Sequence, residues 1–403
     1  MKIIDGKRVY TIVAINPGST STKVGVYRND QKVFIENIYH TKEELDQFDC
    51  VQSQLYYRAK LVETACRVNE VSLDDVDAFV ARGGGMASCV SGCYRVNEQL
   101  LHDCRTARTG VSHPAMLASQ IARYLESRYG GIALVYNPPD VDEFQDLARI
   151  SGIKGMYRDS HLHCLNQKEA VHRYCEQNGL KYEDHNFIVA HIGGGVSFTA
   201  HEHGKMIDSN DNLAGDGPMT PTRVGGFPTV KILKMAFSKK YTYDELEDLL
   251  TRKGGLYSHL GTDDMREIVS RIVEGDKYAK LCTDAMAYQF GKAIGGMAAV
   301  LHGQVKAIIV TGGVARCDYV IEQLRQYVEW IAPMWVLPGE YELAALARGA
   351  WQALEKKIRI LTYTGEPVFK GFSAARYGLY PEGFSKKSQP VQKADSTLTG
   401  SLK

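Results

Sequence analysis

The sequence predicts a mixed α/β fold built from two related halves. Short apolar strands alternate with amphipathic helical stretches along the chain, and one strand, turn, strand pattern occurs twice. The first copy covers residues 11–27 and the second covers 187–200, where Ile12-Val13-Ala14 matches Ile188-Val189-Ala190. Such a repeat is typical of two duplicated α/β domains whose hairpin turns face a common cleft, although short apolar strands can also match by chance.

Length and composition agree with this fold class. At about 100–200 residues per domain, 403 residues predict two domains. The 44% hydrophobic and 24% charged residues and the net charge of +1 exclude a fibrous or disordered chain and any general attraction for nucleic acid. We find no signal-peptide core and no run of about 18 apolar residues, and the nine cysteines lack zinc-like spacing. We therefore expect a cytoplasmic protein with reduced thiols, whose partners include neither nucleic acid nor membrane.

The first half opens with a hairpin over residues 11–27. Its turn, Asn16-Pro17-Gly18-Ser19-Thr20-Ser21-Thr22, carries amide and hydroxyl groups that suit phosphate oxygens or hydrated magnesium, and it is also an ordinary turn composition. A second apolar strand, 78–81, ends directly before Arg82. Helical periodicity predicts helices over 43–49, 53–70 and 113–128.

The second half repeats the plan. Strand 187–192 is followed by Gly193-Gly194-Gly195, which either lets the backbone approach a polyphosphate or forms a bulge. Strand 307–310 is followed by Thr311-Gly312-Gly313, a corner that can hold a phosphate or an adenosine group. We expect domains over 1–158 and 159–372 and a flexible tail over 373–403, with further helices over 165–178, 243–251 and 278–302.

Two arginines lie at the ends of segments that we expect to reach the cleft. Arg82 follows a strand, and Arg223 ends the polar segment 208–223. Two guanidinium groups from two halves can clamp one phosphoryl group, although a single arginine is more often a surface ion pair.

Six motifs in chain order resemble those of the acetokinase family, and within it the butyrate kinases. They are Ala14-Ile15-Asn16-Pro17-Gly18-Ser19-Thr20-Ser21-Thr22-Lys23, Leu162-His163-Cys164-Leu165-Asn166-Gln167-Lys168, His191-Ile192-Gly193-Gly194-Gly195, Gly215-Asp216-Gly217-Pro218-Met219-Thr220-Pro221, Leu260-Gly261-Thr262-Asp263-Asp264 and Val310-Thr311-Gly312-Gly313.

The resemblance implies a fold and an activity. The fold is that of the acetate and sugar kinase, Hsp70 and actin superfamily: two duplicated actin-like, ribonuclease H-like domains around a nucleotide cleft, with a last helix that returns to the first domain. The activity is the reversible phosphorylation of a short-chain carboxylate by ATP with magnesium, which gives an acyl phosphate and ADP. The acid expected is butyrate or a branched acid of four or five carbons, and the assembly expected is a homodimer or a higher homo-oligomer.

The resemblance also implies residue roles. Arg82, His163 and Arg223 match residues around the transferring phosphoryl group, and His113 matches one that lies beside the acyl group together with Arg82. Magnesium is assigned to Asn16 and Glu340. The residues assigned to ATP are Asn16, Ser19, Ser21, His191, Gly193, Gly194, Gly195, Asp264, Arg266, Gly312 and Gly313.

One departure from the family pattern bears on activity. Asn137 stands where the family usually has the acid of an Asp-Pro pair, so a neutral amide occupies an expected catalytic position. Either Asp140 or Asp142 compensates for the missing acid, or turnover is low. Three alternatives remain open: an acetate or propionate kinase, an actin-like ATP-binding protein without an acyl substrate, and a catalytically impaired relative.

Overall fold

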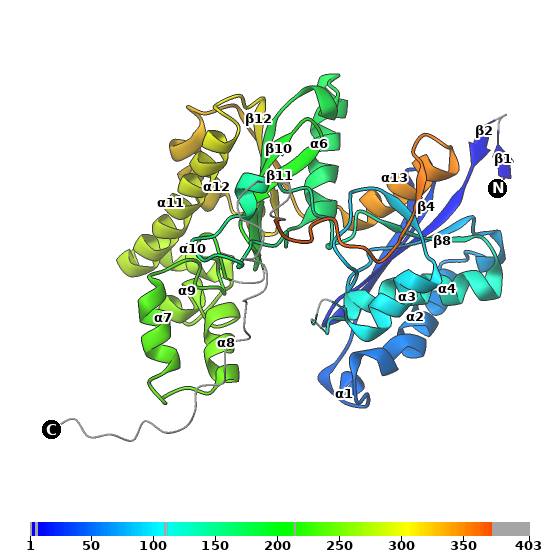
Figure 1. Cartoon of the computed structure of the whole chain (residues 1–403), viewed down its shortest axis with the longest axis horizontal. Coiled ribbons are helices and arrows are strands. Elements are labelled where there is room, and N and C mark those ends of the chain that lie inside the picture. Colours follow the sequence, from blue (N-terminus) through cyan, green and yellow to red (C-terminus); the bar gives the residue numbers. More distant parts are fainter. Residues whose placement is uncertain (1, 5–6, 109, 111, 213–214, 373–403) are drawn as a thin grey trace, which may run out of the picture. The chain divides into compact units, whose positions relative to one another are not determined.

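Two large β-sheets organise the chain (Figure 1). The computed structural model describes residues 2–4, 7–108, 110, 112–212 and 215–372. The predicted tail, 373–403, lies outside the described residues. Strands β1 (Lys2–Ile4) and β2 (Lys7–Val9) form a separate antiparallel pair ahead of the first large sheet.

The first large sheet has seven strands in the order β14-β7-β8-β6-β3-β4-β5. The antiparallel hairpin predicted over 11–27 is β3 and β4, and β3 also pairs in parallel with β6. The strands are β3 (Thr11–Pro17), β4 (Ser21–Arg28), β5 (Gln31–Tyr39), β6 (Ala78–Ala81), β7 (Cys93–Arg95), β8 (Ile132–Tyr136) and β14 (Ile360–Thr362).

The second large sheet has five strands in the order β11-β10-β9-β12-β13. Strand β9 pairs antiparallel with β10 and parallel with β12. The strands are β9 (Phe187–Ile192), β10 (Val196–Glu202), β11 (Lys205–Ser209), β12 (Ala307–Gly312) and β13 (Met334–Pro338).

The two sheets share one topology over five strands. In the first, β5, β4 and β3 are antiparallel neighbours, and β3, β6 and β8 are parallel neighbours. In the second, β11, β10 and β9 are antiparallel neighbours, and β9, β12 and β13 are parallel neighbours. The duplication predicted from the match between residues 12–14 and 188–190 is therefore confirmed, because both segments lie in the central strand of this unit.

Helices cover the first sheet on both faces. Phe79, Ile15 and Ile121 belong to the core between the sheet and its helices on one face. These helices are α2 (Leu55–Val68), α3 (Glu98–Thr106) and α4 (Leu117–Tyr129), with the short α1 (Lys42–Leu45), α5 (Asp146–Arg149) and the 3₁₀ turns Val51–Gln54, Leu73–Asp75 and Pro114–Met116 nearby.

The second sheet has its own core, centred on Phe198, Phe290 and Val310. Helices α9 (Gly255–Leu260), α10 (Met265–Val273), α11 (Lys277–Val300) and α12 (Asp318–Val328) contribute side chains to this core. The same part of the chain also holds α7 (Thr229–Ala236) and α8 (Tyr243–Thr251), and 3₁₀ turns lie at Tyr182–Asp184 and Val314–Arg316. Among the described helices, none is both long enough and apolar enough to cross a membrane.

Two further helices lie against each other. Helix α6 (Cys164–Asn178) packs on the second sheet, whereas α13 (Glu342–Leu354) packs on the first through Leu346 and its neighbours. Arg348 of α13 donates to Glu169 of α6 at 2.9 Å. The domain boundary near residue 158 stays a prediction.

Some predicted helix bounds are wrong. The helix expected over 43–49 is α1, which ends at Leu45, and the helix expected from residue 113 begins at Leu117 after a 3₁₀ turn. The ring of His113 caps the 3₁₀ turn, which explains why α4 begins later than predicted. A capping box of Thr41 and Glu44 sets the start of α1, close to the predicted one, and the early end of α1 has no such explanation. Helices α3, α5, α7, α9 and α10 were not predicted.

Candidate active site

The turn between β3 and β4 presents the first candidate group, Asn16. Its side chain is buried at the end of β3, and its Nδ2 donates to the carboxylate of Glu342. Its Oδ1 is buried and has no hydrogen-bond partner among the described residues. An unsatisfied buried acceptor is costly, so this oxygen is suited to a ligand. Ser19 and Ser21 lie on the same turn, where the carbonyl of Ser21 accepts from Gly18 N at 2.7 Å.

Arg58, which sequence reasoning missed, holds this turn from α2. Its Nη1 donates to the carbonyl of Gly18 at 3.0 Å and to Oγ1 of Thr22 at 2.9 Å. The side chain is fully buried, its Nη2 has no partner among the described residues, and burial lowers its pKa to about 10. A buried cation without a carboxylate partner adds positive potential next to the turn.

Arg82 and His113 lie next to the turn. Arg82 follows β6, its backbone N donates to Ile15 O at 3.1 Å, and its Nη2 lies 3.7 Å from Oε1 of Glu342. The Nδ1 of His113 accepts from Ala115 N at 3.1 Å, and its Nε2 lies 3.3 Å from Oγ of Ser19. Burial, with Arg82 and Arg58 nearby, lowers the pKa of His113.

Asn137 and Asp140 follow β8. The Oδ1 of Asn137 accepts from Gly92 N at 2.8 Å, so this amide is engaged in holding a turn. Asp140 accepts from Met86 N at 3.2 Å through Oδ1, but its Oδ2 is buried without a partner among the described residues. Burial raises the pKa of Asp140 to about 7, and Arg82 is one of the charges that oppose this shift.

The glycine run after β9 lies against Arg223. A Cβ on Gly195 would lie 2.3 Å from Oδ1 of Asn212 and 3.1 Å from Nη1 of Arg223. The same Nη1 donates to Oδ1 of Asn212 at 2.8 Å, and Thr220 donates to the carbonyl of Gly194 at 2.8 Å. Burial lowers the pKa of Arg223. The polar segment that ends at Arg223 thus packs on the predicted phosphate loop.

Two histidines stack beside these groups. The rings of His163 and His191 lie 3.8 Å apart between centroids, at an angle of 7°. Burial, the neighbouring His191, and Arg82 and Arg223 hold the pKa of His163 well below its usual value. Burial also lowers the pKa of His191 to about 4. Arg82, which follows β6, and Arg223, which ends the polar segment after β11, thus both lower the pKa of one imidazole.

Two glutamates face this group. Glu340, the predicted magnesium ligand, accepts from Lys23 Nζ at 2.7 Å. Its pKa is lowered because the interaction with Lys23 outweighs the effect of burial. Glu342, two residues on, contacts both Asn16 and Arg82 and was not predicted. A lone glutamate at a helix start carries no sequence signal for this role.

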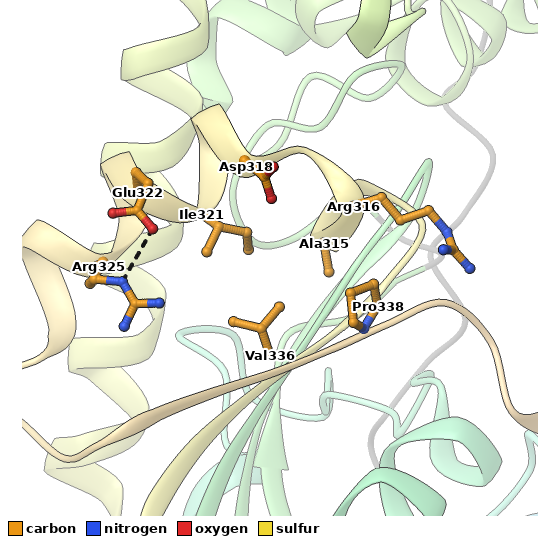
Figure 2. Close-up of a pocket in the computed structure, with 8 residues that line it drawn as sticks. All are labelled: Ala315, Arg316, Asp318, Ile321, Glu322, Arg325, Val336 and Pro338. Carbon is orange, nitrogen blue, oxygen red and sulfur yellow. Dashed lines mark ion pairs between the residues drawn. The ribbon is translucent and has the colours of Figure 1, made fainter.

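The predicted adenosine turn lies next to the glycine run. A Cβ on Gly312 would lie 2.4 Å from Ile192 O, so only glycine fits where β12 ends beside β9. Gly313 is exposed. A cavity of about 470 Å³ begins just after this turn, between Ala315 and Val336 (Figure 2). None of the predicted site residues lines this cavity, and an ion pair between Glu322 and Arg325 lies at its rim.

The described part of the chain shows no interaction between the other predicted site residues and Asp264 or Arg266, which are two of the predicted nucleotide contacts. Asp264 caps α10 and binds Arg266 through Nη2 at 2.7 Å, and the side chain of Arg266 is 92% exposed. Among the described residues, no hydrogen bond or ion pair joins this pair to the other predicted site residues.

Comparisons with known proteins identify the family to which the chain is similar. The sequence model of the acetokinase family matches residues 154–330. A probable butyrate kinase of Clostridium botulinum (strain Alaska E43 / Type E3) is 39% identical over 353 residues, which cover 87% of this chain and 99% of that protein. Butyrate kinase 2 of Clostridium acetobutylicum is 39% identical over 345 residues, which cover 86% of this chain and 97% of that protein.

Solved structures agree in fold. Acetate kinase of Porphyromonas gingivalis superposes with a TM-score of 0.69 at 16% identity, over 85% of this chain and 99% of that one. A propionate kinase of Francisella tularensis gives a TM-score of 0.66 at 16% identity, over 84% and 98%. These confirm the predicted fold class, and the sequence matches confirm the predicted resemblance: the chain belongs to the acetokinase family.

Proposed function

We propose that this chain transfers the γ-phosphoryl group of ATP, reversibly, to the carboxylate of butyrate or a branched acid of four or five carbons. Membership of the acetokinase family and relatives named butyrate kinase support kinase chemistry on a carboxylate and favour this acid over acetate. The observation that carries the proposal is the stack of His163 on His191 beside the glycine run, where Arg82 and Arg223 both lower the pKa of His163. Two cations that act on one imidazole suit a transferring phosphoryl group.

The attacking group needs no base. A carboxylate is already ionised at pH 7, so its oxygen attacks the γ-phosphorus directly. Phosphoryl transfer depends mainly on positioning and on neutralising charge on the equatorial oxygens. Arg82 and Arg223 supply that charge in this proposal, and His163 donates a hydrogen bond. His113 and Arg82 hold the acid.

The nucleotide phosphates lie along the glycine run in the proposed complex. Gly193, Gly194 and Gly195 bring their backbone close to the phosphates, and His191 lies at the start of this loop. Ser19 and Ser21 contribute from the other turn. Gly312 and Gly313 hold the adenosine, and we keep Asp264 and Arg266 as proposed contacts of the nucleotide. Asn137 stays a proposed member of the catalytic group.

The residues present fit magnesium. The unsatisfied Oδ1 of Asn16 and the carboxylates of Glu340 and Glu342 are hard oxygen donors of the kind this ion prefers. Among the described residues no group of three or more His, Cys, Asp or Glu side chains could hold a metal, which suits an ion bound mainly through water and phosphate. When bound, magnesium neutralises charge on the phosphate oxygens.

The test is acyl phosphate formation, trapped with hydroxylamine, from ATP, magnesium and each of formate, acetate, propionate, butyrate, isobutyrate and valerate. We expect a maximum at four or five carbons, with cross-reactivity because one methylene changes binding by about 1–3 kcal/mol. A maximum at acetate or propionate would assign the shorter acid. ATP hydrolysis that ignores every acid would instead indicate an actin-like protein, and ATP binding without turnover would indicate an impaired relative.

A further inference from the structure

Two adjacent residues of α6, Asn166 and Gln167, hold the stacked histidines through the Nδ1 atoms of the rings. Asn166 contacts one ring directly, and Gln167 acts on the other through Ser197. The Nδ1 of His163 lies 2.8 Å from Oγ of Ser197, which is bound by Gln167. The Nδ1 of His191 lies 2.9 Å from Nδ2 of Asn166. Each hydrogen bond can be assigned a direction, because its other partners can act in only one way.

For His191, the backbone of Tyr341 fixes the direction. Tyr341 N can only donate, and it donates to Oδ1 of Asn166 at 2.7 Å, so the amide NH₂ of Asn166 must face His191. The second proton of that NH₂ goes to Oγ1 of Thr311 at 3.2 Å, whose own hydroxyl donates to Gly339 O. The Nδ1 of His191 therefore accepts and carries no proton.

For His163, the carbonyl of Ser197 fixes the direction. It can only accept, and Nε2 of Gln167 lies 3.2 Å from it and 2.7 Å from Oγ of the same serine. The oxygen of Gln167 consequently faces Nε2 of His201 at 3.0 Å, and that ring accepts from the hydroxyl of Tyr182. Oγ of Ser197 accepts from Nε2 of Gln167 and, at 3.4 Å, from the backbone N of His163. Because both of its acceptor positions are used, its own proton goes to Nδ1 of His163.

We propose that Asn166 and Gln167 are positioning residues that lock His191 and His163 as neutral imidazoles protonated at Nε2, so that both rings present an N–H to the transferring group. Neither Nε2 atom has a hydrogen-bond partner among the described residues. That the acceptor is a phosphoryl oxygen rests on the proposed function, whereas the tautomers rest on the hydrogen bonds alone. A ring locked in this way donates and cannot serve as a general base at Nε2.

The surroundings favour neutral rings. Arg82 and Arg223 oppose a positive charge on His163, and the stacked rings would repel each other if both were charged. Glu340 and Glu342 face His191 and favour its charged form, but burial outweighs them. Neutral imidazoles can donate hydrogen bonds beside Arg82 and Arg223 without adding a positive charge, which the two arginines would repel.

The test is ¹⁵N NMR of protein labelled at histidine, with signals assigned through His163→Gln and His191→Gln. We expect an unprotonated Nδ1 and a protonated Nε2 for both rings between about pH 6 and pH 8. A proton on Nδ1 of either ring would overturn the proposal. This readout needs neither substrate nor turnover, so absence of acyl phosphate would refute the proposed function and leave the tautomers unaffected.

Two substitutions extend the test. Asn166→Asp replaces the donor with an acceptor of the same shape, so we expect His191 to gain a proton on Nδ1; Gln167→Glu takes the Ser197 proton, so we expect the same at His163. Each should lower kcat by about 10²-fold, as removal of a transition-state donor does, with a smaller change in KM.

The matched control is Asn210→Asp. Asn210 is buried in the same half of the chain, where its Oδ1 accepts from Phe198 N at 2.8 Å and its Nδ2 donates to Val196 O at 3.0 Å. Among the described residues it makes no hydrogen bond to a histidine. Its histidine signals should match the wild type. If Asn166→Asp and Gln167→Glu leave both Nδ1 atoms unprotonated, the positioning role is wrong, and a fall in activity then reflects packing alone.

Discussion

The guanidinium of Arg82 lies 3.7 Å from the carboxylate of Glu342, measured from Nη2 to Oε1. This relationship joins the end of β6 to the first residue of α13, on the sheet face that α13 covers. The same carboxylate accepts from Asn16. One glutamate therefore holds a cation and an amide that the sequence places on different strands.

Arg82→Ala should lower turnover without unfolding the protein. Its side chain is half-buried and its contact with Glu342 is long, so little stability depends on it, whereas a lost charge on the transferring group costs about 10²–10³-fold in kcat. The measurement is hydroxylamine-trapped acyl phosphate, with Arg95→Ala on β7 as a control for loss of a partly exposed arginine. Turnover equal to wild type in Arg82→Ala would remove this residue from the catalytic group.

Gly195→Ala should impair ATP-dependent turnover more than Gly194→Ala does. A Cβ on Gly195 would lie 2.3 Å from Asn212 and 3.1 Å from Arg223, whereas a Cβ on Gly194 would meet only Oγ1 of Thr222, at 3.9 Å. Displacing Arg223 from its position costs at least tenfold in kcat/KM if it binds the transferring group. Steady-state kinetics of the two variants check this. Equal activity in the two variants would show that the packing of Gly195 against Arg223 does not affect turnover.

Asp140 should make stability depend on pH. Burial raises its pKa to about 7, so the folded chain keeps this proton over a range in which the unfolded chain, with a pKa of about 3.9, has lost it. The free energy of unfolding should fall as pH rises from about 4 to about 7, by up to about 1.4 kcal/mol per pH unit from this group. Urea unfolding at pH 5 and pH 7 should show a smaller fall in Asp140→Asn than in wild type; an identical fall would refute the assignment.

Asn137→Asp should change turnover only slightly. Asn137 has φ of 41° and its Oδ1 is already bound to Gly92 N, and aspartate tolerates this backbone region and accepts the same hydrogen bond. The same trapping assay compares it with wild type. A large rise in activity would instead show that the amide at this position has degraded the site.

Arg58→Met should reduce activity more than stability. Methionine removes an unpaired buried cation, which offsets part of the loss of hydrogen bonds to Gly18 and Thr22, but it frees the turn that carries Asn16. We expect kcat/KM for ATP to fall about tenfold. Arg149→Met is the matched contrast: it breaks a buried ion pair with Asp142 at 2.7 Å and should cost about 3–5 kcal/mol of stability while the folded fraction keeps its kcat. If Arg58→Met instead loses stability and keeps its kcat/KM for ATP, the role of Arg58 is structural.

Much of the fold could be predicted from local pattern. Residues 12–15 and 187–190 are continuous apolar runs, and the match between 12–14 and 188–190 correctly indicated two related halves. Helix bounds were less accurate where a cap decided them, as at His113, whose ring caps a 3₁₀ turn ahead of α4.

The sequence by itself determined the principal strands and several helices, the duplicated plan, the family and the residues that carry recognisable motifs, because periodicity and glycine-rich turns act over a few neighbouring positions. Only the tertiary structure brought Glu342 to Arg82, placed Arg58 under the first turn, and set the donors of Asn166 and Gln167 against His191 and His163. These relationships depend on which polar groups share a buried space once the sheets have packed, and burial makes each unpaired group seek one specific partner. No local pattern encodes that choice.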